Sequence, residues 1–457
     1  MNNDILSCSA RELSSLIKTR ELSPVELTTA YLQEIEQTNP NTDVYITVAS
    51  ELAITQARKA EEEILNGHYR GPLHGIPFAC KDLYATKGVR TTGGSRVLED
   101  FVPTYDAQVI KSLYQAGSVL LGKANMHEFA YGATGENPYF GTVSNPYDKT
   151  RNAGGSSSGS AAAVASNTAV FALGTDTGGS VRAPSALCGV VGLKPTYGRI
   201  SLQGVVPYCW SLDHFGVSTK TVYDAALVMD TVSKNPPGKG TFAESLDSNV
   251  KGMRIGIPRN FFYEDCEKNI LEHTKKIIEG LTSRGCEFID IETPKLDYSR
   301  TVSLLIQLPE VLSYHSRYFK EKRDLYGKDM MAGMAVGQFI LSEHYIRAKR
   351  IVELYKTKMA DIFNDVDLLL TPSCPITAPL LDQVTVTTGG RTEAKGNAIT
   401  RFTSFFNLTG NPAITVPAGT DSNGLPTGVQ LVGPHFSEIS VLKAADVIEQ
   451  VAGEFYN

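Results

Sequence analysis

The sequence predicts an α/β fold with largely buried strands. An apolar run, a helical pattern and a second apolar run follow one another between residues 73 and 122, and this alternation resumes after about residue 250. The composition fits a globular chain, since 42% of the residues are hydrophobic and 20% are charged. A chain of 457 residues can bury a large core without disulfide or metal support.

The chain opens with helices that carry clear start signals. Ser9 and Glu12 have the spacing of a capping box, in which each side chain accepts a hydrogen bond from the other residue's backbone N–H. Ser23 repeats this signal, with Pro24 at the first helical position. A third helix, rich in alanine and glutamate, is expected over about residues 51–66.

The middle of the chain alternates between strands and helices. Residues 73–83 predict a buried strand that ends at Lys81, residues 106–116 predict a helix, and residues 118–122 predict the next strand. A further strand, with the sequence AVFALGTD, ends at Asp176. A helix is then expected to start at or after Ser180, following a Gly-Gly turn.

The second half of the chain continues this alternation without an internal repeat. Strands are expected over residues 253–258, 287–291, 367–371, 413–417 and 429–433, and helices over about 266–284, 299–322 and 338–364 and at the C-terminus. Two polar stretches, residues 236–249 and 386–396, are expected to be surface loops. Neither has the character of a domain linker, so we expect one domain.

Charge and cysteine content narrow the classes of function. The 43 basic and 49 acidic residues give a net charge of −6, which disfavours a nucleic-acid partner. Seven widely spaced cysteines without a CxxC pair predict reduced thiols. No apolar run approaches the ~20 residues of a membrane helix. We therefore expect a cytoplasmic protein that acts without nucleic acid or membrane.

Metal and nucleotide cofactors are not expected. The eight histidines form no HExxH motif and no cluster with cysteine. The glycine-rich runs GGSSSGS and GTDTGGS end neither in the Gly-Lys-Ser/Thr of a phosphate loop nor in the pattern of a dinucleotide-binding turn.

Nucleophilic catalysis is the remaining class of chemistry that these residues could support. Ser180 follows a strand and a Gly-Gly turn, where free backbone N–H groups could hold a negative oxygen. Lys81 follows an apolar run, and a desolvated lysine can lose its proton near neutral pH. Taken singly, Ser180 is better explained as a helix cap, and Lys81 as a surface lysine paired with Asp82.

The combination of motifs resembles the amidase signature family. The stretch GGSSSGSAAAVASNTAVFALGTDTGGSVRAPS, residues 154–185, matches the signature of that family. Residues 71–83, 116–132, 137–148, 189–201, 407–419 and 424–433 also resemble it. The resemblance implies one compact domain over residues 1–457, with a large mixed β-sheet sandwiched between helical layers. It implies a signature core over about 71–205 and variable substrate-side helices over about 299–365.

The resemblance also implies the roles of individual residues. Ser180 aligns with the nucleophile, Ser156 with a bridging serine that follows a cis peptide bond, and Lys81 with the general base. Asp176 and Arg182 are expected to form a structural pair. The remaining expected site residues are Thr177, Gly178 and Gly179 in the oxyanion hole, and Tyr131, Gly132, Ala133 and Thr134 beside the substrate. No cofactor and no metal is expected.

The expected function is hydrolysis of a small, largely uncharged amide through an acyl-enzyme, with release of ammonia or an amine. One alternative is the glutamine-hydrolysing A subunit of the tRNA-dependent amidotransferase. That branch holds glutamine with an arginine, expected near Ala332 to Ala335, and an aspartate, expected near Thr400, and this sequence has neither charge there. A carbamate or urea hydrolase of the same family is a further alternative. A homodimer is a common state of such enzymes.

Overall fold

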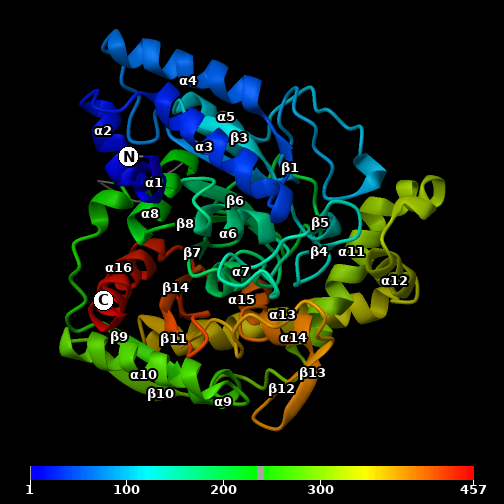
Figure 1. The fold of residues 1–457 in the computed structure, drawn as a ribbon. Helices are drawn as coiled ribbons and strands as arrows, with labels where there is room; N and C mark the ends of the chain where they lie inside the picture. Colours follow the sequence, from blue (N-terminus) through cyan, green and yellow to red (C-terminus); the bar gives the residue numbers. More distant parts are fainter. Residues whose placement is uncertain (1, 234–240, 457) are drawn as a thin grey trace.

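One mixed sheet organises the chain, which a computed structural model describes over residues 2–233 and 241–456. Eleven of the described strands form this sheet (Figure 1). In their order across the sheet they are β1 (Tyr45–Val48), β3 (Val119–Ala124), β2 (Pro77–Lys81), β6 (Phe171–Asp176), β8 (His214–Thr219), β7 (Val191–Lys194), β14 (Ala413–Thr420), β15 (Pro426–Val432), β11 (Leu368–Pro372), β9 (Arg254–Pro258) and β10 (Glu287–Ile291).

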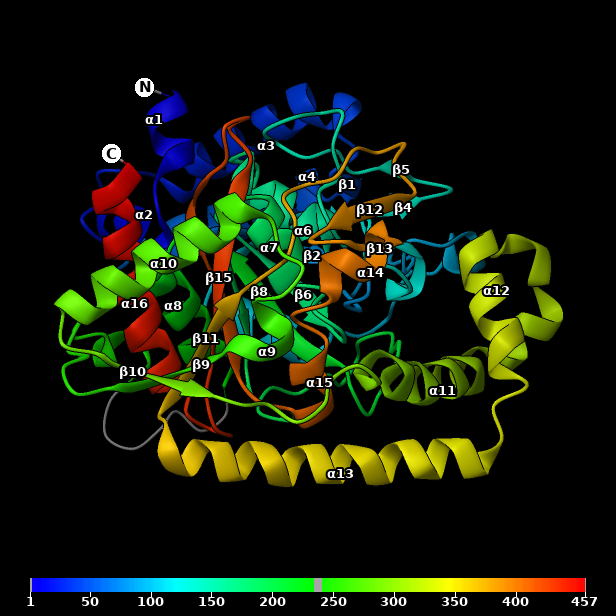
Figure 2. The same cartoon turned by 90° about the horizontal axis from the view of Figure 1, so that it is seen from below.

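Helices flank this sheet, and both ends of the described chain lie on one side of the molecule (Figures 1 and 2). The first half contributes α1 (Asn2–Ser7), α2 (Ala10–Lys18), α3 (Pro24–Thr38), α4 (Ser50–Leu65), α5 (Gln108–Gln115), α6 (Ser158–Ala165), α7 (Arg182–Leu187) and α8 (Val222–Val232). The second half contributes α9 (Arg259–Phe262), α10 (Lys268–Ser283), α11 (Ser299–Glu321), α12 (Lys328–Gly337), α13 (Ser342–Asp365), α14 (Lys395–Thr400), α15 (Phe405–Thr409) and α16 (Glu438–Tyr456).

The C-terminal strands separate two hydrophobic cores. Successive side chains of a strand point to opposite faces of its sheet. In β11, Leu368 and Leu370 pack in the core that contains α8, α10 and α16, whereas Leu369 packs in the core of α11, α12 and α13. The long helix α13 runs along the outside of this second core (Figure 2). The expected α/β domain, with a large mixed sheet between helical layers, is therefore confirmed.

The register of the central strands brings the ends of β2, β6 and β8 to one edge. β2 pairs in parallel with β6, so Lys81 and Thr175 both lie where these strands finish. β8 runs antiparallel to β6, with His214 opposite Asp176. Asp213, which precedes β8, therefore reaches the same edge. Strand topology thus concentrates charged side chains where the candidate site lies.

Most of the expected elements are present, with three differences. Both capping boxes at α2 and α3 are confirmed. Residues 73–76 precede β2 as turns because the backbone N–H groups of His74 and Ile76 bond locally to Gly71 and Leu73. Residues 386–396 are not a loop: β12 (Thr385–Thr388) and β13 (Arg391–Ala394) pair as an antiparallel hairpin, followed by α14.

The last difference concerns the expected long helix over 338–364, which begins only at Ser342 and is preceded by the separate helix α12. Of the expected loop 236–249, residues 236–240 lie outside the described part of the chain. Within the described residues, no helix is long and apolar enough to cross a membrane. A two-stranded ladder, β4 (Glu136–Asn137) with β5 (Gly141–Thr142), completes the secondary structure near the site.

Candidate active site

Lys81 lies at the end of β2 and is fully buried. Its Nζ donates to Ser156 Oγ at 2.7 Å and to Thr175 Oγ1 at 2.9 Å. Burial lowers the pKa of Lys81 to about 7, although Asp213 and Asp176 attract the charged form. Asp82 does not pair with this lysine, because it accepts from Thr92 and faces Lys123. Lys81 can therefore act as a base near neutral pH.

Ser156 precedes α6 and is also fully buried. The peptide bond between Gly155 and Ser156 is cis. The carbonyl of Ser156 accepts from the N–H of His127 at 3.2 Å, while Ser157 Oγ donates to the carbonyl of Thr175 at 3.1 Å. These contacts fix the loop between β5 and α6 against the end of β6. The Ser156 hydroxyl is left facing Lys81.

Ser180 lies in the turn between β6 and α7. Its carbonyl accepts from the N–H of Ser157 at 3.1 Å, which joins this turn to the loop of Ser156. Ser180 borders a cavity, whereas Ser156 has no exposed surface. Within the described residues, no hydrogen bond joins the Ser156 and Ser180 hydroxyls. Catalytic hydrogen bonds often shorten only when substrate is bound, so this geometry leaves a relay between the two serines possible.

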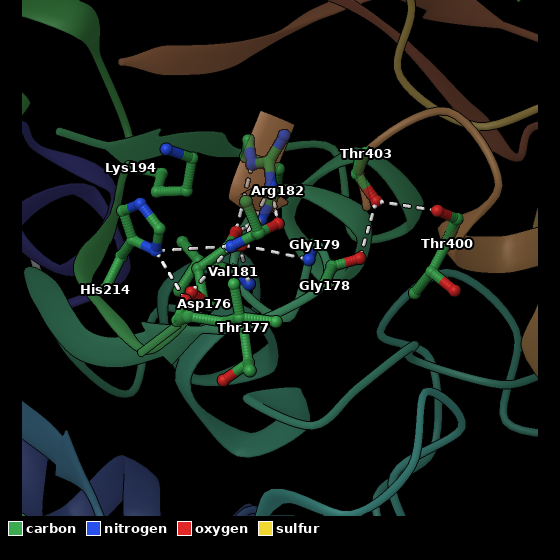
Figure 3. A network of polar contacts seen from close by, with 12 residues as sticks. Asp176, Thr177, Gly178, Gly179, Val181, Arg182, Lys194, His214, Thr400 and Thr403 are labelled. Atoms are coloured by element: carbon green, nitrogen blue, oxygen red, sulfur yellow. Dashed lines mark hydrogen bonds and ion pairs between the residues drawn. The ribbon is translucent and has the colours of Figure 1, made fainter. Parts of the chain in front are cut away.

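Asp176 and Arg182 hold the turn in place (Figure 3). Arg182 donates to Asp176 through Nε at 3.0 Å and through Nη2 at 2.8 Å, and both residues are fully buried. Asp176 also accepts from the backbone N–H groups of Gly179 and Val181. Burial opposes ionisation of Asp176, but Arg182 outweighs it and holds the pKa of Asp176 well below its usual range. The expected structural pair is present.

The backbone N–H groups of this turn differ in whether they already have a hydrogen-bond acceptor. Gly179, predicted to belong to the oxyanion hole, instead donates its N–H to Asp176 Oδ1 at 2.9 Å. Among the described residues, the N–H groups of Thr177, Gly178 and Ser180 have no acceptor. Gly179 has a φ of +114°, and a Cβ there would lie 1.8 Å from Thr403 Oγ1. Its role is therefore to form the turn, while its neighbours offer donors.

A cavity of about 470 Å³ opens in front of Ser180. A volume of this order suits a small-molecule ligand. The structure brings all four expected substrate residues to its wall: Tyr131, Gly132, Ala133 and Thr134. Thr177 and Gly178 also line it. We call this space the Ser180 cavity.

Several residues of the site carry no signal of their own in the sequence. Thr175 accepts from Lys81, and Asp213 accepts from Thr177 Oγ1 at 2.6 Å. Burial raises the pKa of Asp213 to about 6, and hydrogen bonds from Thr177 and the backbone oppose this shift. Arg300 on α11 and Asp329 on α12 both line the Ser180 cavity. Arg300 and Asp329 lie far along the chain from the 154–185 motif, so no local pattern links them to the site.

Arg300 and Asp329 are notable because neither side chain forms an ion pair or hydrogen bond with another described residue. Glu136 is a third charged residue of the cavity, but its Oε1 forms an ion pair with Lys395 Nζ at 2.6 Å. The Ser180 cavity thus contains one unpaired positive and one unpaired negative side chain. In the part of the chain that the structure describes, no group of three or more histidine, cysteine, aspartate or glutamate residues could hold a metal ion.

Comparison with known proteins assigns the family. The model of the family described as Amidase matches residues 26–442. The chain belongs to the amidase signature family. It is therefore an enzyme that acts on the C–N bond of amides. Lys81, Ser156 and Ser180, which the resemblance predicts to be the catalytic residues, lie at the end of β2, before α6 and in the turn after β6.

Relatives match over nearly the full chain. The A subunit of the Glutamyl-tRNA(Gln) amidotransferase of Geobacter metallireducens is 37% identical, over 98% of each chain. A structure from work on the evolutionary origins of an s-triazine catabolic enzyme has a TM-score of 0.92 at 29% identity, over 97% of this chain and 98% of that one. The corresponding A subunit of Thermotoga maritima has a TM-score of 0.82 at 31% identity, over 98% and 95% of the two chains.

Proposed function

We propose that this enzyme cleaves an amide through an acyl-enzyme on Ser180, with Ser156 as relay and Lys81 as base. The contact that carries this proposal is the 2.7 Å hydrogen bond between Lys81 Nζ and Ser156 Oγ, made by a lysine whose pKa burial lowers to about 7. A lysine with that pKa is substantially neutral at physiological pH and can accept a proton. Ser180 borders the cavity that would hold the amide.

The reaction starts with two proton transfers and one bond formation. Neutral Lys81 takes the proton of Ser156, Ser156 takes the proton of Ser180, and Ser180 Oγ attacks the amide carbonyl carbon. The N–H groups of Thr177, Gly178 and Ser180, which have no acceptor among the described residues, would stabilise the oxyanion. The relay then returns a proton to the leaving nitrogen, and the C–N bond breaks. Water attacks the ester by the same route, giving the acid and restoring Ser180.

Glutamine is the substrate that we propose first, with the chain acting as the A subunit of a tRNA-dependent amidotransferase. The names of the curated relatives favour this alternative over the stand-alone amidase for an uncharged amide that the sequence favours. The unpaired Arg300 and Asp329 suit an α-amino acid, since a guanidinium binds a carboxylate and a carboxylate binds an ammonium group. These residues would replace the arginine and aspartate that the sequence lacks near residues 332–335 and 400.

A stand-alone hydrolase of a neutral amide, carbamate or urea is the second candidate. Gly333 on α12 carries no side chain, and a Cβ there would lie 2.4 Å from the ring of Tyr131. Tyr131 thus occupies the space of a larger residue at that position, and Thr400 lines the cavity without a charge.

The test is product release by the purified protein from glutamine, a neutral aliphatic amide, an anilide, a carbamate and a urea. Ser180→Ala should lower turnover by at least about a thousandfold, because the acyl-enzyme can no longer form. Arg300→Gln and Asp329→Asn should raise KM for glutamine by roughly tenfold or more, with less effect on neutral amides.

Arg317→Gln is the matched control on the same helix, because Arg317 is exposed and does not line the Ser180 cavity. Glutamine turnover that depends on Arg300 and Asp329 supports the first candidate, and a requirement for added amidotransferase subunits strengthens it. Turnover of neutral amides that is insensitive to both substitutions overturns it and favours the second. Mass photometry of the same sample tests the homodimer.

A further inference from the structure

A second cavity, of about 430 Å³, lies beside the segment that leads into β8. We call it the Trp210 cavity. Its walls are largely apolar or aromatic, and include Tyr197, Ile200, Leu202, Val205, Trp210 and Phe215. Apolar walls with a few polar groups are typical of sites for small organic ligands. None of these six residues lines the Ser180 cavity.

Two aromatic residues of this cavity face solvent. Trp210 is 73% exposed and Tyr197 is 45% exposed, which is costly for rings of this size unless something covers them. Tyr197 Oη donates to the carbonyl of Trp210 at 2.9 Å, so the two segments are joined there. The ring of Tyr197 also packs edge-on against buried His214, with the centroids 5.3 Å apart. The ring of Tyr197 is therefore held in place, and its hydroxyl is tied to the backbone of Trp210.

Two polar residues that line the Trp210 cavity, Thr175 and Asp213, are buried. Thr175 is 3% exposed and Asp213 is 6% exposed. Asp213 accepts hydrogen bonds from Thr177 Oγ1 and from the N–H groups of Tyr208 and Cys209. The Cys209 N–H is shared between both carboxylate oxygens, so four contacts already fill the roughly four acceptor positions of Asp213. Thr175 Oγ1 has a second lone pair beyond the one that receives the bond from Lys81.

The same two residues contact the candidate catalytic groups. Thr175 is bonded to Lys81, and Asp213 is bonded to Thr177 in the turn before Ser180. Each of these bonds is made by a side chain that also lines the Trp210 cavity. A molecule bound in this cavity would therefore act directly on the partners of the base and of the oxyanion turn. It would do so without entering the Ser180 cavity.

We propose that the Trp210 cavity binds a small aromatic molecule with an O–H or N–H donor, and that its occupancy changes the turnover rate at Ser180. The aromatic ring packs against Trp210 and Tyr197, and the donor bonds to Thr175 Oγ1. Binding needs no turnover, so the site can be tested even if the proposed substrate is wrong. The effect on rate rests on the proposed roles of Lys81 and Ser180.

Binding can be followed by the fluorescence of Trp210, which is the only tryptophan of the sequence. Phenol is the probe, with anisole as the ring without a donor and cyclohexanol as the donor without a ring. We expect saturable quenching by phenol. The affinities of the other two should be at least about tenfold weaker, because anisole lacks the hydrogen-bond donor and cyclohexanol lacks the aromatic ring. N-acetyltryptophanamide corrects for collisional quenching, and calorimetry repeats the measurement without a fluorophore.

Val205→Phe and, separately, Ser201→Phe fill the cavity and should abolish saturable binding. Val102→Phe is the matched control, since Val102 is exposed and lines neither cavity. With a substrate found in the panel above, phenol should change kcat with little change in KM. Equal affinities for the three probes, binding that survives in both blocking variants, or purely competitive inhibition would overturn the proposal.

Discussion

Lys81 is the residue whose environment departs most from its ordinary chemistry. A lysine in water is charged at neutral pH, but this one has no exposed surface, and two hydroxyl oxygens are the only hydrogen-bond partners of its Nζ in the described chain. Hydroxyls satisfy its N–H donors without supplying a negative charge. Desolvation therefore dominates, and the pKa falls to about 7. Geometry and pKa together make this lysine the candidate base.

The pH dependence of turnover follows from this pKa. Below about pH 7 Lys81 is protonated and cannot accept a proton, so kcat/KM should fall as the pH falls, by about tenfold per pH unit. Asp213 attracts the charged form of Lys81 and raises its pKa, so Asp213→Asn should move the acidic fall in kcat/KM to lower pH. Asp148→Asn, which changes an acidic residue of an exposed turn, should leave it unmoved. If kcat/KM of Asp213→Asn fell at the same pH as in the wild type, this assignment would be contradicted.

At the scale of elements, the turn between β6 and α7 combines local and distant contacts. Gly178 and Gly179 are adjacent, yet their surroundings differ. A Cβ on Gly178 would have Ser404 Cβ at 3.9 Å, an ordinary contact, whereas a Cβ on Gly179 would lie 1.8 Å from Thr403 Oγ1. Only Gly179 also has a φ that disfavours other residues. The second glycine therefore sets the course of the turn.

Gly179→Ala should disrupt the turn, while Gly178→Ala should fold with little change. We expect kcat to fall by about a hundredfold or more in Gly179→Ala, because the N–H groups that would hold the oxyanion are displaced. Thermal unfolding and steady-state kinetics on one amide check both variants. Near wild-type kcat in Gly179→Ala would show that the turn tolerates the displacement.

At the scale of the whole molecule, strands from both halves of the chain form one continuous sheet. Its six strands before residue 220 lie side by side and its five later strands lie side by side, and antiparallel pairing of β7 with β14 joins the two sets into one ladder. The N-terminal helices are tied to the same body. Asp224 on α8 accepts from the N–H groups of Ala10 and Arg11 at 3.0 and 3.1 Å, at the start of α2. The range 1–457 stays our prediction for a single folding unit.

One calorimetric unfolding transition is the expected behaviour of such a unit. Asp224→Ala should lower the free energy of unfolding by about 1–2 kcal/mol through loss of the α2 cap, and should shift the whole transition. Turnover should be unchanged, because Asp224 lines neither cavity. Asp290→Ala, in an exposed ion pair with Arg259, is the control and should change stability by under about 1 kcal/mol. Two separate transitions would contradict a single unit.

The sequence by itself determined the features that depend on short stretches of chain. Ser9 and Ser23 cap their helices through residues three positions away, and the Asp176–Arg182 pair spans a single turn. The apolar strand runs and the 154–185 motif likewise predicted the α/β fold and the family. Such signals are readable because the interacting groups are close in the chain.

Only the tertiary structure decided which distant groups meet. Asp213 reaches Thr177 because β8 runs antiparallel to β6, and Arg300 and Asp329 reach the Ser180 cavity because α11 and α12 pack over it. The sequence also did not indicate that the Gly179 N–H donates to Asp176, or that residues 385–394 form a hairpin. A contact between remote segments depends on sheet order and packing, and no local pattern of residues records either.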